Sequence, residues 1–155
     1  MIMAFMASAN AQDNAKARNF ELSVAESYDM SGIMPNSLVS ELAFNYKFNS
    51  IGAVGLSGLY STDSDDSTWG VMANLAVRPQ LGEKFCFIPS VGLGIMRGKF
   101  NGSDAKTRAA GSISVEARYN VTNDFFCGIK LNALSAGTKS NYSTMLLGVT
   151  LGIAF

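Results

Sequence analysis

Apolar and polar residues alternate along most of the chain, and the clearest alternation lies at the C-terminal end. From Thr144 onward every second residue is large and apolar, and most of the residues between them are small or polar. The apolar positions are Met145, Leu147, Val149, Leu151, Ile153 and Phe155. Because successive side chains of a strand point to opposite faces, this segment is predicted to be a β-strand with one apolar face.

Seven earlier segments show the same alternation, although two of them are rich in glycine. The eight predicted strands cover 20–28, 38–48, 51–60, 68–78, 85–99, 112–119, 125–132 and 142–155. Their connections are alternately short (49–50, 79–84, 120–124) and longer and polar (29–36, 61–67, 101–107, 135–141). This pattern is typical of up-and-down outer-membrane barrels, in which short turns face the periplasm and longer loops face outwards.

The polar face of these segments carries charges of both signs among Gly, Ala and Ser. The seven charged residues are Glu21, Glu41, Lys47, Arg78, Glu116, Arg118 and Lys130. An eight-stranded barrel is only wide enough inside to be filled by side chains, and an unpaired charge there would be costly. We therefore predict a salt-bridged barrel interior. A polar conduit or gate is the alternative interpretation.

Aromatic residues lie near the predicted strand ends. The periplasmic end has Phe20, Tyr46, Phe48, Phe85, Phe87, Tyr119, Phe125 and Phe155, and the outer end has Tyr28, Tyr60, Trp69 and Tyr142. Aromatic girdles of this kind mark the two lipid–water interfaces of a membrane barrel, so the apolar face is predicted to meet lipid. A soluble barrel or β-sandwich would leave them unexplained. Glu26 interrupts the apolar face, either because it lies near the outer rim or because of a β-bulge.

The last segment, Tyr142 to Phe155, resembles the terminal strand of outer-membrane barrels, which ends in Phe. Phe87–Gly94 and Tyr119–Phe126 resemble hairpin and turn phrases of the small barrels related to outer-membrane protein A, outer-membrane protein X and the opacity proteins. The resemblance implies an all-β, eight-stranded antiparallel transmembrane barrel in a Gram-negative outer membrane, expected to be monomeric. It also implies that Phe155 is part of a signal for the barrel-assembly machinery. No peptidoglycan-binding domain like that of outer-membrane protein A is expected.

The N-terminal residues resemble the end of an export signal. A short apolar stretch precedes Ala9 and Ala11, which form a small-residue cleavage pattern, but a charged segment in front of it is missing. The predicted organisation is a truncated signal peptide at 1–11, a periplasmic tail at 12–18 and the barrel at 19–155.

No residue pattern indicates catalysis, a cofactor or a metal site. The chain has no histidine, the residue that most often acts as a base near neutral pH and activates a serine nucleophile. Asp63, Asp65 and Asp66 lack the glycine and distal glutamate of a calcium loop. Cys86 and Cys127 lie on opposite faces of non-adjacent predicted strands, so both are predicted to be free thiols.

These observations favour a non-enzymatic outer-membrane barrel with a structural or adhesion-type role through four short extracellular loops. The alternative is a narrow porin-like channel for ions or small solutes. Expected partners are membrane lipid, the assembly machinery and an unidentified surface ligand. Because the formal net charge is zero, nothing points to nucleic acid.

Overall fold

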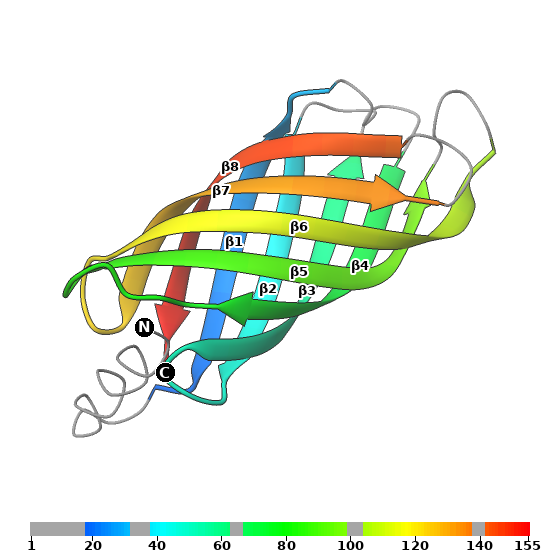
Figure 1. Ribbon diagram of the computed structural model, residues 1–155. Helices are drawn as coiled ribbons and strands as arrows, with labels where there is room; N and C mark the ends of the chain where they lie inside the picture. The colour runs from blue at the N-terminus through cyan, green and yellow to red at the C-terminus, as the bar shows by residue number, and fades with distance from the viewer. Residues whose placement is uncertain (1–17, 32–37, 63–66, 99–103, 138–141) are drawn as a thin grey trace.

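The computed structural model describes residues 18–31, 38–62, 67–98, 104–137 and 142–155. They form eight antiparallel strands that close into one barrel in sequence order (Figure 1). The strands are β1 (Phe20–Asp29), β2 (Leu38–Lys47), β3 (Gly52–Thr62), β4 (Ser67–Val77), β5 (Phe85–Gly98), β6 (Lys106–Asn120), β7 (Phe125–Ala136) and β8 (Tyr142–Ala154). This confirms the predicted architecture. Within the described ranges, no helix is long and apolar enough to cross a membrane.

Two predictions fall outside the described residues. The predicted signal peptide and all of the predicted tail except Arg18 lie in 1–17, and the three aspartates considered for calcium lie in 63–66.

Burial alternates along each strand with the large apolar side chains on the outside. In β1, Leu22 and Val24 are exposed while Glu21, Ser23 and Ala25 are buried. Apolar side chains are exposed on all eight strands, and Leu93 reaches 76%. Water-soluble monomers rarely expose an apolar surface larger than a few hundred Å². The outer surface is therefore suited to lipid, as predicted.

Five strands extend further toward the outer end than the alternation predicts, among them β1, which ends at Asp29. β6 begins at Lys106 rather than Ser112, β7 ends at Ala136, and the facing ends of β3 and β4 include Thr62 and Ser67. Apart from Leu134, these ends are small or polar on both faces, so their alternating signal is weak, and pairing with neighbouring strands holds them extended. The connections at the outer end are therefore 30–37, 63–66, 99–105 and 137–141.

Glu26 faces outwards without a β-bulge. The register is continuous through it, with Glu26 opposite Ser40 on β2 and Val149 on β8. The bulge interpretation is therefore wrong, and Glu26 is an exposed carboxylate on the outer surface.

Side-chain hydrogen bonds fix two of the periplasmic turns. Asn49 Oδ1 accepts from the backbone N–H groups of Ile51 (2.9 Å) and Gly52. Thr122 Oγ1 accepts from the N–H groups of Asp124 (3.2 Å) and Phe125 (3.0 Å). Asn and Thr are favoured in turns because their side chains can replace missing backbone partners.

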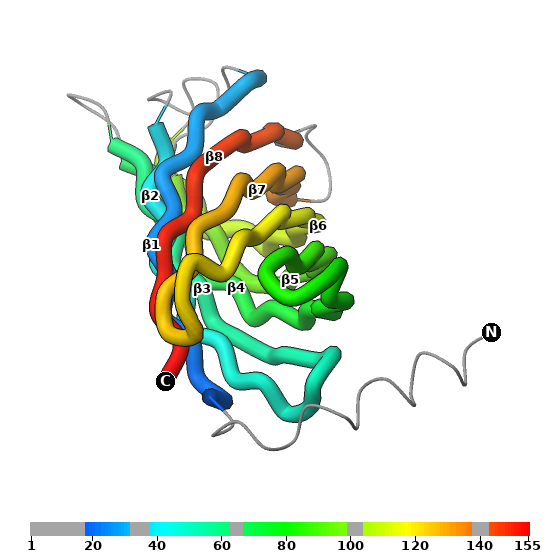
Figure 2. The backbone as a smooth tube through the Cα atoms, turned by 90° about the vertical axis from the view of Figure 1, so that its left-hand side faces the viewer, coloured from blue at the N-terminus to red at the C-terminus, as the bar shows by residue number. Residues whose placement is uncertain are grey.

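The barrel closes where β1 pairs with β8, which lie side by side in Figure 2. The pairing extends past the strand ends: Phe20 N–H donates to the Phe155 carbonyl at 3.0 Å, and Phe155 N–H donates to the Phe20 carbonyl at 2.9 Å. We call this β1–β8 pairing the closing seam. It leaves neither strand with an open edge. A strand in lipid requires this, because its backbone groups have no water to bind.

The apolar outer surface predicts a depth-dependent effect of charge. Val149 lies midway along β8 and is 57% exposed, whereas Met145 lies near its outer end on the same face. In phospholipid vesicles we expect Val149→Arg to lower the free energy of unfolding by about 2–4 kcal/mol and Met145→Arg by about 0–1 kcal/mol. Denaturant titration of the refolded proteins measures both. Equal effects would contradict a membrane-spanning β8.

Candidate functional site: the barrel interior

Glu21 lies inside the periplasmic end of the barrel, where its carboxylate binds three cations. Arg78 and Arg118 contact Oε2, the latter at 2.9 Å, and Lys47 Nζ lies 3.6 Å from Oε1. Lys47 is on the neighbouring strand β2, Arg78 directly follows β4, and Arg118 is on β6. The carboxylate therefore also links β1 to parts of the barrel wall that do not pair with it. The Glu21 side chain is 3% exposed. A carboxylate buried so deeply is tolerated only when cations and hydrogen bonds replace its hydration.

Arg118 extends this group across the interior. Its Nε donates to Glu116 Oε1 at 2.7 Å, and its guanidinium lies 3.7 Å from the centre of the Phe126 ring, a cation–π geometry. We call Glu21, Lys47, Arg78, Glu116 and Arg118 the Glu21 cluster.

The other two predicted interior charges form a separate pair. Lys130 Nζ on β7 donates to both carboxylate oxygens of Glu41 on β2, each at 2.7 Å. Lys130 is opposite Glu116 in the β6–β7 register, yet its ammonium group binds a carboxylate from β2. Alternation along the chain shows which residues face inwards, but the pairing depends on how the barrel closes.

A polar cavity of about 50 Å³ lies beside both groups of charges. Glu41, Lys130 and Glu116 line it, together with Thr150, whose buried Oγ1 has no hydrogen-bond partner among the described residues. A cavity of this size and polarity has room for a few water molecules, each of which needs two to four polar partners.

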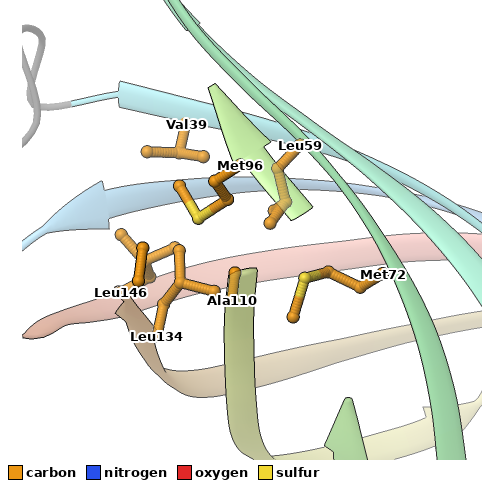
Figure 3. Close-up of a cluster of buried hydrophobic side chains, with 8 residues drawn as sticks. Val39, Leu59, Met72, Met96, Ala110, Leu134 and Leu146 are labelled. Atoms are coloured by element: carbon orange, nitrogen blue, oxygen red, sulfur yellow. The ribbon is translucent and has the colours of Figure 1, made fainter. Parts of the chain in front are cut away.

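Apolar side chains fill the interior nearer the outer end, which the sequence analysis did not predict. We call this set the apolar layer (Figure 3); it consists of Val39, Leu59, Met72, Met96, Ala110, Leu134, Ala136 and Leu146. Met72, Met96 and Leu146 are each only 1% exposed. The signal was present in the sequence, because these residues occupy the otherwise polar face of their strands toward their outer ends. Their close packing excludes water from this part of the interior.

A small polar group lies at the outer end of β1. Asp29 is buried, and its Oδ1 accepts hydrogen bonds from Ser31 N–H (2.9 Å), Ser31 Oγ (2.7 Å) and Thr144 Oγ1. The alternation predicts a loop from Asp29 onward, whereas Asp29 is the last residue of β1. It therefore fastens β1 to the start of β8 at the outer end of the closing seam.

Aromatic rings lie on the outer surface near both rims. At the periplasmic rim Phe20 lies 5.2 Å from Tyr46, 5.7 Å from Phe44 and 6.1 Å from Phe155 between ring centres, across three neighbouring strands. A second contact joins Phe85 and Tyr119 at 5.0 Å. The other predicted periplasmic rings (Phe48, Phe87, Phe125) and the outer rings Tyr28, Tyr60 and Trp69 are exposed. Tyr142 begins β8, and its side chain is outside the described set.

The cysteines and the acidic residues of the described ranges form no further site. Cys86 is buried and Cys127 half-buried, and both are free thiols, as predicted. In the part of the chain that the structure describes, no three residues of the type His, Cys, Asp or Glu are grouped to hold a metal ion.

A family model described as "Outer membrane protein beta-barrel domain" matches residues 1–155, the full sequence. The chain belongs to this outer-membrane barrel family. The barrel therefore resides in the outer membrane, with its apolar surface against lipid and with the Glu21 cluster and the Glu41–Lys130 pair inside. A search of curated proteins finds no match.

Solved structures show the same fold at low sequence identity. The N-terminal β-barrel domain of Pseudomonas aeruginosa OprF is 15% identical, with a TM-score of 0.68 over 89% of this outer-membrane barrel and 98% of that chain. Neisserial surface protein A is 14% identical, with a TM-score of 0.63 over 88% and 95%. The Yersinia pestis attachment invasion locus protein Ail, in complex with the heparin analogue sucrose octasulfate, is 14% identical, with a TM-score of 0.51 over 88% and 95%.

The Glu21 cluster predicts a large cost for removing its central carboxylate. We expect Glu21→Gln to lower the free energy of unfolding by about 3–5 kcal/mol, because it removes the counter-charge of the buried Arg78 and one of the two counter-charges of Arg118. Glu26→Gln is a matched control on the same strand, since Glu26 is exposed on the opposite face; we expect a change below about 0.5 kcal/mol. Denaturant unfolding in detergent micelles measures both, and similar effects of the two substitutions would contradict the structural role of the cluster.

Proposed function

We propose that this outer-membrane barrel is closed to ions and solutes, and that it acts as a structural and surface-contact protein. The observation that carries the proposal is the apolar layer, which lies across an interior already narrow enough to be filled by side chains. An ion that crossed it would have to exchange much of its hydration for apolar contacts, which costs several kcal/mol. The layer thus separates the charged interior from the outer end.

We infer that the barrel is not an enzyme. The chain lacks histidine, and the interior carboxylates of Glu21, Glu41 and Glu116 are held in ion pairs rather than directed at a nucleophile. Ser90 and Ser114 hydrogen-bond to each other at 2.6 Å rather than to a base. A serine without an adjacent base is a weak nucleophile.

Contact with other molecules is then made from the outside of the barrel. Lipid covers the apolar strands, and the connections 30–37, 63–66, 99–105 and 137–141 are the segments available for an adhesion-type contact. Loops carried on a rigid scaffold are where such function usually resides. The name of Ail marks it as an attachment protein, and its complex contains a heparin analogue, which supports surface contact as a role open to barrels of this fold.

The second candidate function is a narrow porin-like channel. The polar cavity of about 50 Å³ beside Glu41 and Lys130 favours it, because a passage for ions needs polar groups along its wall. A channel would also require the apolar layer to open.

Planar-bilayer recordings distinguish the two functions. We expect the refolded wild-type protein to show no resolved current steps. In the double variant Met72→Ala with Met96→Ala we expect small steps, because the apolar layer loses its two long side chains.

A matched control removes side chains of similar size from the outer face of the same barrel wall: Leu93→Ala with Ile95→Ala, both exposed on β5, is expected to remain silent. Heat-modifiability on a gel verifies that each variant is folded. Clear channels in the wild-type protein would contradict the closed barrel, and a silent double variant would show that the apolar layer is not the barrier.

We further propose that Phe155 and the strand before it serve as the signal for the barrel-assembly machinery. Phe155 is 56% exposed at the periplasmic rim, where it contacts Phe20. For Phe155→Ala we expect the amount in the outer-membrane fraction to fall severalfold, with refolding into detergent nearly unchanged. Equal losses in cells and in detergent would indicate a purely structural role.

A further inference from the structure

A row of polar side chains crosses the outer surface of the barrel just above its apolar belt. In the strand registers Tyr60 on β3 is opposite Trp69 on β4, Trp69 is opposite Arg97 on β5, and Arg97 is opposite Thr107 on β6. All four side chains are exposed. Each carries at least one N–H or O–H donor, and directly opposed residues have Cβ atoms about 4.5–5.5 Å apart.

Arg97 occupies this row at the height of the outer lipid–water interface. The preceding outward residues of its strand, Leu93 and Ile95, are large, apolar and exposed. Its neighbour Trp69 is an aromatic residue of the outer rim, and such rings lie at the level of the lipid headgroups. The guanidinium therefore lies where hydrocarbon gives way to headgroups.

The protein offers Arg97 no counter-charge among the described residues, where no carboxylate forms an ion pair with it. Glu26 faces outwards as well, but it is four strands away in the sheet, a separation of about 19 Å at about 4.8 Å per strand. Lys106 is exposed at the same end of the hairpin, but it is opposite the inward-facing Gly98, so it does not belong to the outer row. The charge of Arg97 is permanent, so its partner is expected to come from the surroundings.

We propose that Arg97, Trp69 and Thr107 form a binding site for the phosphate groups of lipid headgroups in the outer leaflet. A planar guanidinium matches two phosphate oxygens at once. The Trp69 indole N–H and the Thr107 hydroxyl supply further donors on either side of it, and the Trp69 ring packs beside the acyl chains. The site requires only the location in the outer membrane, and it is independent of whether the interior conducts.

The lipid is favoured over a soluble anion because of where the row lies. The residues below it are apolar and meet acyl chains, so a ligand that joins phosphate to acyl chains satisfies both parts of this surface together. A free phosphate ion would gain only the polar part, and exposed cations alone hold such ions weakly.

The fluorescence of Trp69 reports on this site directly, because Trp69 is the only tryptophan of the chain. The protein refolded in micelles of a maltoside detergent, which carries no phosphate, is titrated with lipid A, which carries phosphate groups, and with dephosphorylated lipid A. We expect a saturable change in Trp69 emission with lipid A that weakens as the salt concentration rises. With dephosphorylated lipid A, or with inorganic phosphate added to the solution, we expect no such change.

Arg97→Gln is expected to weaken lipid A binding about fivefold, since one cation at a membrane surface contributes about 1 kcal/mol. Arg97→Lys keeps the charge but not the fork of donors, so we expect an intermediate affinity. Arg18→Gln is the matched control, because Arg18 pairs with Asp124 at the opposite rim; it should bind as the wild type does. Heat-modifiability verifies that all variants are folded.

Three results would overturn the proposal. The first is an Arg97→Gln variant that binds lipid A as tightly as the wild type, and the second is a loss of equal size in Arg18→Gln. The third is a response to dephosphorylated lipid A or to inorganic phosphate that equals the response to lipid A, which would assign the emission change to acyl chains or to a soluble anion.

Discussion

Complete pairing of the backbone is the constraint on which the rest of this structure depends. In hydrocarbon an unpaired N–H or C=O group costs several kcal/mol, so the sheet must have no open edge. The closing seam between β1 and β8 removes the last one. Once the sheet is closed, every side chain faces either lipid or a narrow interior. The sequence alternates because successive residues of a strand face lipid and the interior in turn.

The closed interior imposes a second requirement, because its contents have almost no access to water. The structure meets it differently along the barrel. Toward the periplasm Glu21 is surrounded by cations, and further in Lys130 contacts both oxygens of Glu41. Toward the outer end, the interior is filled by residues such as Met72 and Leu146 that need no partners. The polar part links non-adjacent strands, and the apolar part packs side chains of many strands together. Both therefore stabilise the wall of the barrel.

Much of the fold can be predicted from the sequence because the side chains of a membrane barrel alternate between lipid and interior with a period of two residues. The order, number and orientation of the strands follow from segments such as 145–155, in which one face is wholly apolar. Strand ends are less predictable: at Ala109, Ala110 and Gly111 small residues occur on both faces, and only pairing with β5 and β7 reveals the strand. Within the site, inward direction is predictable, but partners are not. Glu116 and Lys130 are neighbours in register, yet Glu116 pairs with Arg118 on its own strand. Lys130 reaches across the lumen to Glu41, a partner that barrel closure selects.

The reciprocal hydrogen bonds between Phe20 and Phe155 have a consequence for biogenesis. The first strand to be synthesised finds its second partner only in the last one, so no partial chain can satisfy the edge of β1. Until β8 has been made, the growing chain carries alternating apolar faces and an open strand edge, the combination most prone to aggregation. Closure of the barrel therefore has to wait for β8, the strand that completes the edge of β1.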